Sequence, residues 1–177
     1  MQSNKHIMDM TPIGMIFEVV KSAEQTQGKS LEMEWQLLPK SGGTPVHVHP
    51  AATEHYKVLE GQLEVCLNGK WQTLNTGEEV IVPAGTPHTF RNPSDRVTRV
   101  YNTHSPAMQF AEYFEGLHSI VQKLSVGGSK PMAMNFNTVT HLSMLMKKHS
   151  KELLSVSPPN VIVSLLSKIG KMRGLKV

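Results

Sequence analysis

Four side chains that commonly ligate metals lie in two short stretches of the sequence: His47, His49 and Glu54 in the first, and His88 in the second. Side chains two residues apart in a strand point to the same side, so His47 and His49 would present two imidazoles to one point. Glu54 follows a short turn, and a later strand would bring His88 to the same place. A His-x-His pair alone is also typical of an ordinary core or surface pair, so the prediction depends on all four residues together.

Three neutral imidazoles and one carboxylate form a mixed nitrogen and oxygen ligand set. Such a set suits one divalent transition metal (Fe, Mn, Zn, Ni, Co or Cu) and does not select among them. It also leaves positions for water, dioxygen or a substrate that binds through two oxygen atoms. Glu54 could be a ligand and, after dissociation, the catalytic proton acceptor of the site.

The first hundred residues predict short β-strands that would position these groups. The β-rich or alternating stretches are 15–20, 31–38, 55–60, 63–67, 71–74, 79–82 and 96–101. Asn68-Gly69 favours a tight hairpin, because both positions of such a turn need a positive φ. Many short strands separated by glycine and proline indicate a β-sandwich or a small barrel.

After Pro106 the apolar spacing changes from two residues to about 3.6, which predicts helices. The expected helices cover about 110–124 and 138–154, and a third begins near 157–160. Its inward side is expected to hold Ile162, Leu165, Leu166 and Ile169. Residues 127–131 are the expected linker.

We therefore predict a β-barrel over residues 1–105 and an α-helical C-terminal extension over 106–177, packed on the barrel or on a partner. The two parts differ in charge, with a net charge of −2 over the first and +6 over the second. Arg173 is the one arginine of the extension, and the sequence contains no zinc finger or RNA-binding motif. Nucleic acid is therefore not an expected partner.

Two stretches resemble the motifs of the cupin superfamily. His47-Val-His-Pro-Ala-Ala-Thr-Glu54, followed after six intervening residues by Gly61, resembles the first motif, and 77–92 (GEEVIVPAGTPHTFRN) resembles the second. Ser41 stands where the family has a leading glycine, a departure that concerns loop geometry. The resemblance covers about residues 12–104, as in compact bacterial cupins.

This resemblance implies a mainly β fold, a single antiparallel, jelly-roll-like cupin barrel of six to eight strands with a C-terminal three-helix extension. It also implies that the family's metal ligands fall on His47, His49, Glu54 and His88, with none missing. A homodimer and a small-molecule ligand or substrate are the partners that the family implies.

Strand parity predicts the lining of the pocket, because inward-pointing Glu54 and His88 would place the residues two positions later on the same side. The expected pocket residues are Tyr56, Phe90, Met33, Trp35 and Tyr101. Each aromatic could equally fill the barrel interior. His104 is expected at the surface, with a place beside the ligands as the alternative.

Composition excludes some other classes of protein. The single cysteine, Cys66, excludes an intramolecular disulfide framework and an iron–sulfur cluster. No apolar run approaches the about 18 to 20 residues of a membrane span, and no hydrophobic signal core follows the N-terminus. We therefore expect a cytoplasmic protein.

The cupin superfamily includes dioxygenases, isomerases, decarboxylases, lyases and binding modules, so the fold alone does not fix the chemistry. We expect a metal-dependent enzyme for an oxygen-rich small molecule, with a dioxygenase-like oxidoreductase favoured over an isomerase or lyase. The alternative is a non-catalytic metal or small-ligand binding protein whose basic tail contacts a partner. Residues 158–177 also have the basic, amphipathic pattern of a membrane-surface helix, although packing on the protein is favoured.

Overall fold

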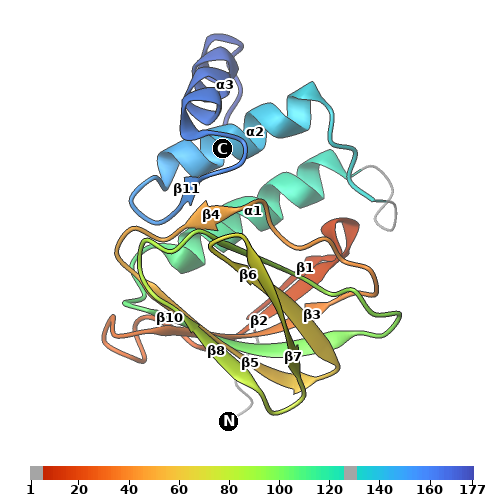
Figure 1. Cartoon of the computed structure of the whole chain (residues 1–177). Coiled ribbons are helices and arrows are strands. Elements are labelled where there is room, and N and C mark those ends of the chain that lie inside the picture. The colour runs from red at the N-terminus through yellow and green to blue at the C-terminus, as the bar shows by residue number, and fades with distance from the viewer. Residues whose placement is uncertain (1–5, 126–130) are drawn as a thin grey trace.

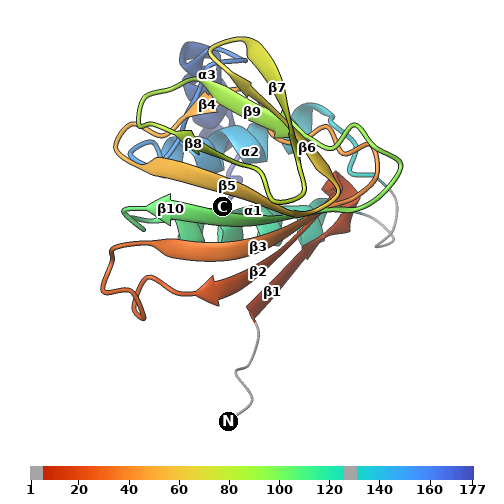
Figure 2. The same cartoon turned by 60° about the horizontal axis from the view of Figure 1, so that its bottom comes forward.

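The computed structural model describes residues 6–125 and 131–177, and its strands form two antiparallel sheets (Figures 1 and 2). The six-stranded sheet has the order β1 (His6–Met10), β2 (Met15–Lys21), β3 (Leu31–Leu37), β10 (Thr98–Ser105), β5 (Thr53–Glu60) and β8 (Glu79–Val82). The five-stranded sheet has the order β11 (Leu154–Ser155), β4 (His47–Val48), β9 (His88–Arg91), β6 (Gln62–Leu67) and β7 (Lys70–Asn75).

The core lies between the inner faces of these two sheets. Strand β3 alternates buried and half-buried residues along its whole length, as expected for a strand with one face in the core. Trp35 on its inner face meets Tyr56 of β5 at 5.5 Å and Phe90 of β9 at 5.1 Å between ring centroids. The contact with Phe90 joins the two sheets, and the predicted mainly β, antiparallel fold is confirmed.

Three helices follow the barrel: α1 (Phe110–Leu124), α2 (Phe136–Lys148) and α3 (Asn160–Met172). They lie on one side of the barrel, with α1 nearest to the strands and α3 farthest from them (Figure 1). Phe114 of α1 packs on Phe17 at 4.6 Å and on Trp35 at 6.2 Å between ring centroids. The extension therefore shares one apolar core with the barrel.

The second helix is shorter than predicted, because it ends at Lys148, six residues before the expected end near 154. The amides of Glu152 and Leu153 donate to the His149 carbonyl, and this turn carries both side chains into the interior. Residues Leu154–Ser155 then form β11 and pair with β4. Strand β11 and the N-terminal strand β1 were not predicted, so the described part of the chain has more strands than the six to eight expected.

The inward face of α3 also differs from the prediction. Ile162 and Leu165 are 44% and 58% exposed, whereas Val163, Ser167 and Gly170 are buried. A Cβ atom at Gly170 would lie 2.4 Å from Met144 Sδ of α2, so small residues permit the close approach of the two helices. Residues 127–130 of the predicted linker lie outside the described residues. No helix in the described ranges has the length and apolar character needed to cross a bilayer.

The loop before β4 depends on Gly43, whose φ is +70° and whose added Cβ would lie 1.7 Å from the Phe90 carbonyl oxygen. Gly43→Ala is therefore expected to lower the free energy of unfolding by about 2–3 kcal/mol, since it combines left-handed backbone with overpacking. Urea denaturation would measure this loss. Gly42→Ala is the matched control, because a Cβ there meets nothing within 4 Å. Equal losses in both variants would contradict the steric explanation.

Candidate metal centre

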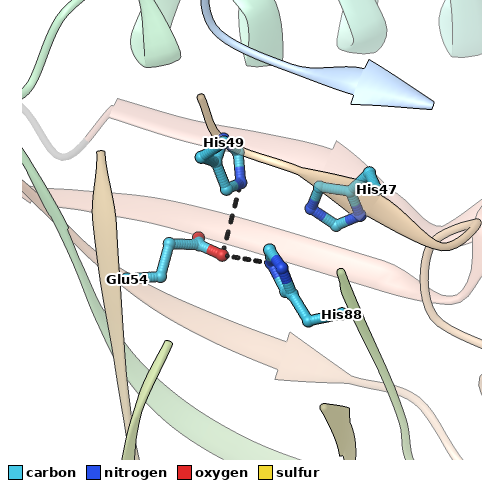
Figure 3. Close-up of side chains that lie close together, drawn as sticks. All are labelled: His47, His49, Glu54 and His88. Carbon is cyan, nitrogen blue, oxygen red and sulfur yellow. Dashed lines mark hydrogen bonds and ion pairs between the residues drawn. The ribbon is translucent and has the colours of Figure 1, made fainter. Parts of the chain in front are cut away.

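The four predicted ligands come together between the two sheets (Figure 3). His47 on β4 is the cross-strand partner of His88 on β9, and His49 follows directly after β4. Glu54 reaches the same place from β5 in the other sheet. All four side chains are at most 5% exposed, and one ligand atom of each lies within 4.8 Å of the others.

Each of the three imidazoles is oriented by a hydrogen bond to a main-chain carbonyl. Nδ1 of His47 donates to Pro45 at 2.9 Å, and Nδ1 of His88 donates to Thr86 at 2.8 Å. Nδ1 of His49 donates to the carbonyl of Glu152 at 2.8 Å. A carbonyl oxygen can only accept, so in each neutral ring the proton is on Nδ1 and Nε2 carries a lone pair.

These lone pairs face a buried carboxylate. Glu54 Oε2 lies 2.9 Å from Nε2 of His88 and 3.4 Å from Nε2 of His49, and His49 Nε2 has no hydrogen-bond partner. Tyr56 donates its hydroxyl proton to Glu54 Oε2, and Asn102 Nδ2 donates to Oε1 at 3.1 Å. Burial opposes ionisation of Glu54, but the positive charge that His49 carries when protonated outweighs it and holds the pKa of the carboxyl well below its usual range.

An ionised carboxylate that faces lone pairs in a buried site needs a cation to be stable. The mixed nitrogen and oxygen donor set and its narrow spacing therefore fit one divalent transition metal, the group that the fold commonly binds. Adjacent ligand atoms around an ion with bond lengths of about 2.0–2.1 Å are about 2.9–3.4 Å apart. Glu54 Oε2 lies 2.9 Å from His88 Nε2 and 3.4 Å from His49 Nε2, which matches this spacing. The donor set does not select one metal among the six expected.

Burial lowers the pKa of His47 from 6.5 to about 3, and the neighbouring imidazoles of His88 and His49 add to this effect. Between these two pH values the unfolded chain binds a proton at His47 and the folded, metal-free chain does not. The free energy of unfolding is therefore expected to fall as the pH decreases from about 6.5 towards 3, by at most about 1.4 kcal/mol per pH unit. Denaturation of wild type and His47→Gln across this range measures the contribution, and parallel curves would contradict it.

Two further buried residues, His104 and Glu152, extend the site and were not predicted as parts of it. His104 Nε2 lies 2.6 Å from Glu152 Oε1, and its Nδ1 lies 3.8 Å from Glu54 Oε1. The expected surface position of His104 is wrong, since the side chain is fully buried. Burial lowers the pKa of His104, but its hydrogen bond with Glu152 and the negative charge of Glu54 outweigh burial, so the net shift is upward.

A sequence signal existed for His104 and not for Glu152. His104 is opposite Glu54 in the β10–β5 register and has the strand parity of Asn102, so inward parity could have placed it beside the ligands. Glu152 was expected within a helix. It reaches His49 and His104 only because the chain turns after α2.

Glu152→Ala is expected to weaken metal affinity by about 10- to 100-fold, the usual effect of removing a group that orients a ligand. The variant keeps the carbonyl that holds His49 but loses the carboxylate that binds His104 and the amide of Gln109. A competition titration with a chromophoric chelator measures the change. Glu115→Ala, which removes an exposed glutamate from α1, is the matched control. Equal affinities in the two variants would show that the Glu152 carboxylate does not support the site.

A cavity of about 490 Å³ opens from the candidate ligands His47 and Glu54 towards the helices. Three of the five predicted pocket residues line it: Trp35, Tyr56 and Phe90. Met33 is buried in the core instead. Tyr101 has the opposite strand parity to Asn102, and its hydroxyl donates to Glu32 on the outer face of the sheet. These two residues were therefore misplaced by the sequence interpretation.

Comparison with known proteins agrees with this architecture. Residues 33–104 match the Cupin_2 family, described as a cupin domain. The solved structure of KdgF from Halomonas sp. superposes with a TM-score of 0.54 at 20% identity, covering 63% of this chain and 96% of that chain. At this identity the likeness shows the fold alone.

Two curated relatives are similar over shorter stretches. The chain is 38% identical over 80 residues to quercetin 2,3-dioxygenase of Bacillus subtilis (strain 168), covering 43% of this chain and 24% of the relative. It is 41% identical over 49 residues to the HTH-type transcriptional regulator SutR of Escherichia coli (strain K12), covering 28% of each. The chain thus spans about a quarter of the length of these two relatives.

Proposed function

Because this chain belongs to the cupin superfamily, we propose that it is a metal-dependent enzyme of the dioxygenase kind that acts on a small molecule. His47, His49, Glu54 and His88 would hold one divalent transition metal. When bound, the ion would supply a Lewis acid, or a centre able to take up dioxygen. The similarity to a quercetin dioxygenase over 80 residues supports oxidoreductase chemistry over an isomerase or lyase.

The chain's own residues would position the substrate and manage its proton. Glu54 is ionised and accepts a hydrogen bond from the Tyr56 hydroxyl, so it can accept a proton from a substrate hydroxyl that replaces that contact. Burial and the adjacent Glu54 carboxylate raise the pKa of Tyr56 well above its usual range, so Tyr56 stays a hydrogen-bond donor. Trp35 and Phe90 exclude water from the inner wall of the cavity.

One observation carries the proposal: three buried imidazoles present Nε2 lone pairs towards one buried carboxylate. His49 Nε2 has no hydrogen-bond partner among the described residues, so the cluster leaves a buried ligand atom unsatisfied where a cation could bind. Two of the four residues, His47 and Glu54, border a cavity large enough for a small molecule.

Dioxygen uptake after anaerobic loading with Fe(II) tests the proposal. Uptake is expected with members of a panel of enols and vicinal diols, only in the presence of metal and substrate. It should be lost in His88→Ala and retained in His55→Ala, since His55 lies on the outer side of β5 and pairs with Glu79. Absence of uptake across the panel, with metal bound, would contradict the dioxygenase proposal.

The second candidate is a non-catalytic protein that binds a metal or a small ligand. The similarity to the regulator SutR supports it, because the matched stretch belongs to a protein named for regulation and not for catalysis. Metal and ligand binding without turnover of any panel compound is the result expected for this candidate.

A further inference from the structure

The cavity beside the candidate metal centre is built by the barrel and by the C-terminal extension together. Its floor is formed by barrel residues, including His47 and Glu54. Its other walls come from all three helices, with Phe114 from α1, Met146 from α2 and Val163 from α3 among them. The helices thus extend the binding space well beyond the residues that match the cupin domain.

The walls of this cavity carry almost no charge. Glu54 is the only formally charged side chain among the described residues that line it, and no lysine or arginine lines it. Away from Glu54 and His47 the lining is mainly aromatic, aliphatic and methionine side chains. A carboxylate, phosphate or sulfate on the body of a ligand would find no cation there and would lose its hydration.

Two hydroxyl groups interrupt the apolar wall. Tyr113 of α1 and Ser143 of α2 line the cavity, and neither side chain makes a hydrogen bond with a described residue. Burial raises the pKa of Tyr113 to about 12, so the phenol stays protonated and can donate. Each of these groups could bind an uncharged oxygen of a ligand without requiring an anion.

We propose, building on the function proposed above, that the substrate is an uncharged, largely apolar molecule with oxygen atoms at one end. The oxygen-bearing end lies at His47 and Glu54, and the apolar body extends between the barrel and the helices. Methionine is the most adaptable apolar side chain, so Met15, Met132 and Met146 suit a body of variable shape. This substrate class is narrower than the oxygen-rich small molecules expected from the sequence, because the cavity requires polar groups mainly at one end of the substrate.

Alkylcatechols provide a direct test, because their heads are identical and their apolar tails differ only in length. Catechol and its 4-methyl, 4-propyl and 4-pentyl derivatives are titrated calorimetrically under argon into Zn²⁺-loaded protein, with oxalate and 2-oxoglutarate as anionic comparators. The affinity is expected to rise about fourfold per methylene while the tail is still being buried. A flat series, or tighter binding of either dianion than of 4-pentylcatechol, would overturn the proposal.

A matched pair of variants locates the tail. Met146→Trp fills the cavity and is expected to reduce the affinity for 4-pentylcatechol at least tenfold while leaving catechol and Zn²⁺ affinities unchanged. Met172→Trp makes the same substitution at a site that is 80% exposed and outside the cavity, and is expected to change none of the three. Equal effects of the two variants on 4-pentylcatechol would place the tail elsewhere and overturn the proposal.

Failure of this inference is distinguishable from failure of the proposed function. Zn²⁺ titration alone reports whether the metal centre exists. The alkylcatechol series is repeated on metal-free protein. The dependence of affinity on tail length should persist there, because the tail contacts the apolar cavity walls and not the metal. Loss of Zn²⁺ binding with a preserved dependence on tail length would contradict only the metal centre. Normal Zn²⁺ binding with a flat series would contradict only the substrate class.

Discussion

Replacing Glu54 with alanine is expected to lower the affinity for a divalent transition metal by about 10²–10³-fold. The corresponding loss of binding free energy is roughly one quarter of the ~10–16 kcal/mol that a four-ligand protein site can contribute. Glu54 is the one anionic member of the candidate set, and its carboxylate faces Nε2 of both His49 and His88. Elemental analysis of purified protein and a chelator competition titration measure metal content and affinity.

The control for this prediction is Glu79→Ala, which removes an exposed glutamate from β8, the strand that pairs with β5. That variant is expected to bind metal as the wild type does. His49→Ala should resemble Glu54→Ala. Metal content near one ion per chain in both ligand variants would show that the assignment of the site is wrong.

Phe114→Ala is expected to lower the free energy of unfolding by about 3–5 kcal/mol, the usual loss for a large aromatic side chain removed from a core. Phe114 is buried and packs on Phe17 and Trp35 of the barrel and on Phe110 of α1. Its removal leaves a cavity at the boundary between barrel and extension. Urea denaturation followed by both far-ultraviolet circular dichroism and tryptophan fluorescence measures the loss.

Phe136→Ala is the matched control, because Phe136 at the start of α2 is 54% exposed and contacts mainly Arg173. The expected loss there is about 0.5–1 kcal/mol. If the two substitutions have equal effects, α1 is not part of the barrel's core. If the two probes give separate transitions in the wild type, barrel and helices unfold independently.

The barrel and its ligands were predictable because strand parity is a strict rule. Once Glu54 and His88 are placed inward, Tyr56 and Phe90 must share their side, and the structure places them there. Tyr101 was misplaced because no candidate metal ligand lies on its strand to show which of the strand's side chains point inward. His104 was missed for the same reason, although its register with Glu54 puts it on the inner face.

The extension was predicted less well, because its buried faces depend on which partner lies opposite. Large apolar side chains favoured Ile162 and Leu165 as the inward face of α3, yet the close approach to α2 requires small residues such as Gly170. Glu152 illustrates the same difficulty. Its role depends on contacts with residues about fifty and one hundred positions earlier in the chain, which no local pattern contains.

The pairing of β11 with β4 has a consequence for the order of events during synthesis on the ribosome. The carbonyl that orients His49 belongs to Glu152, and Ser155 is the strand neighbour of His47. A nascent chain that has released only its barrel therefore holds these two histidines without their final supports. The complete geometry of the proposed metal centre therefore forms only after Ser155 has emerged, so a chain that ends with the barrel cannot bind an ion in this arrangement.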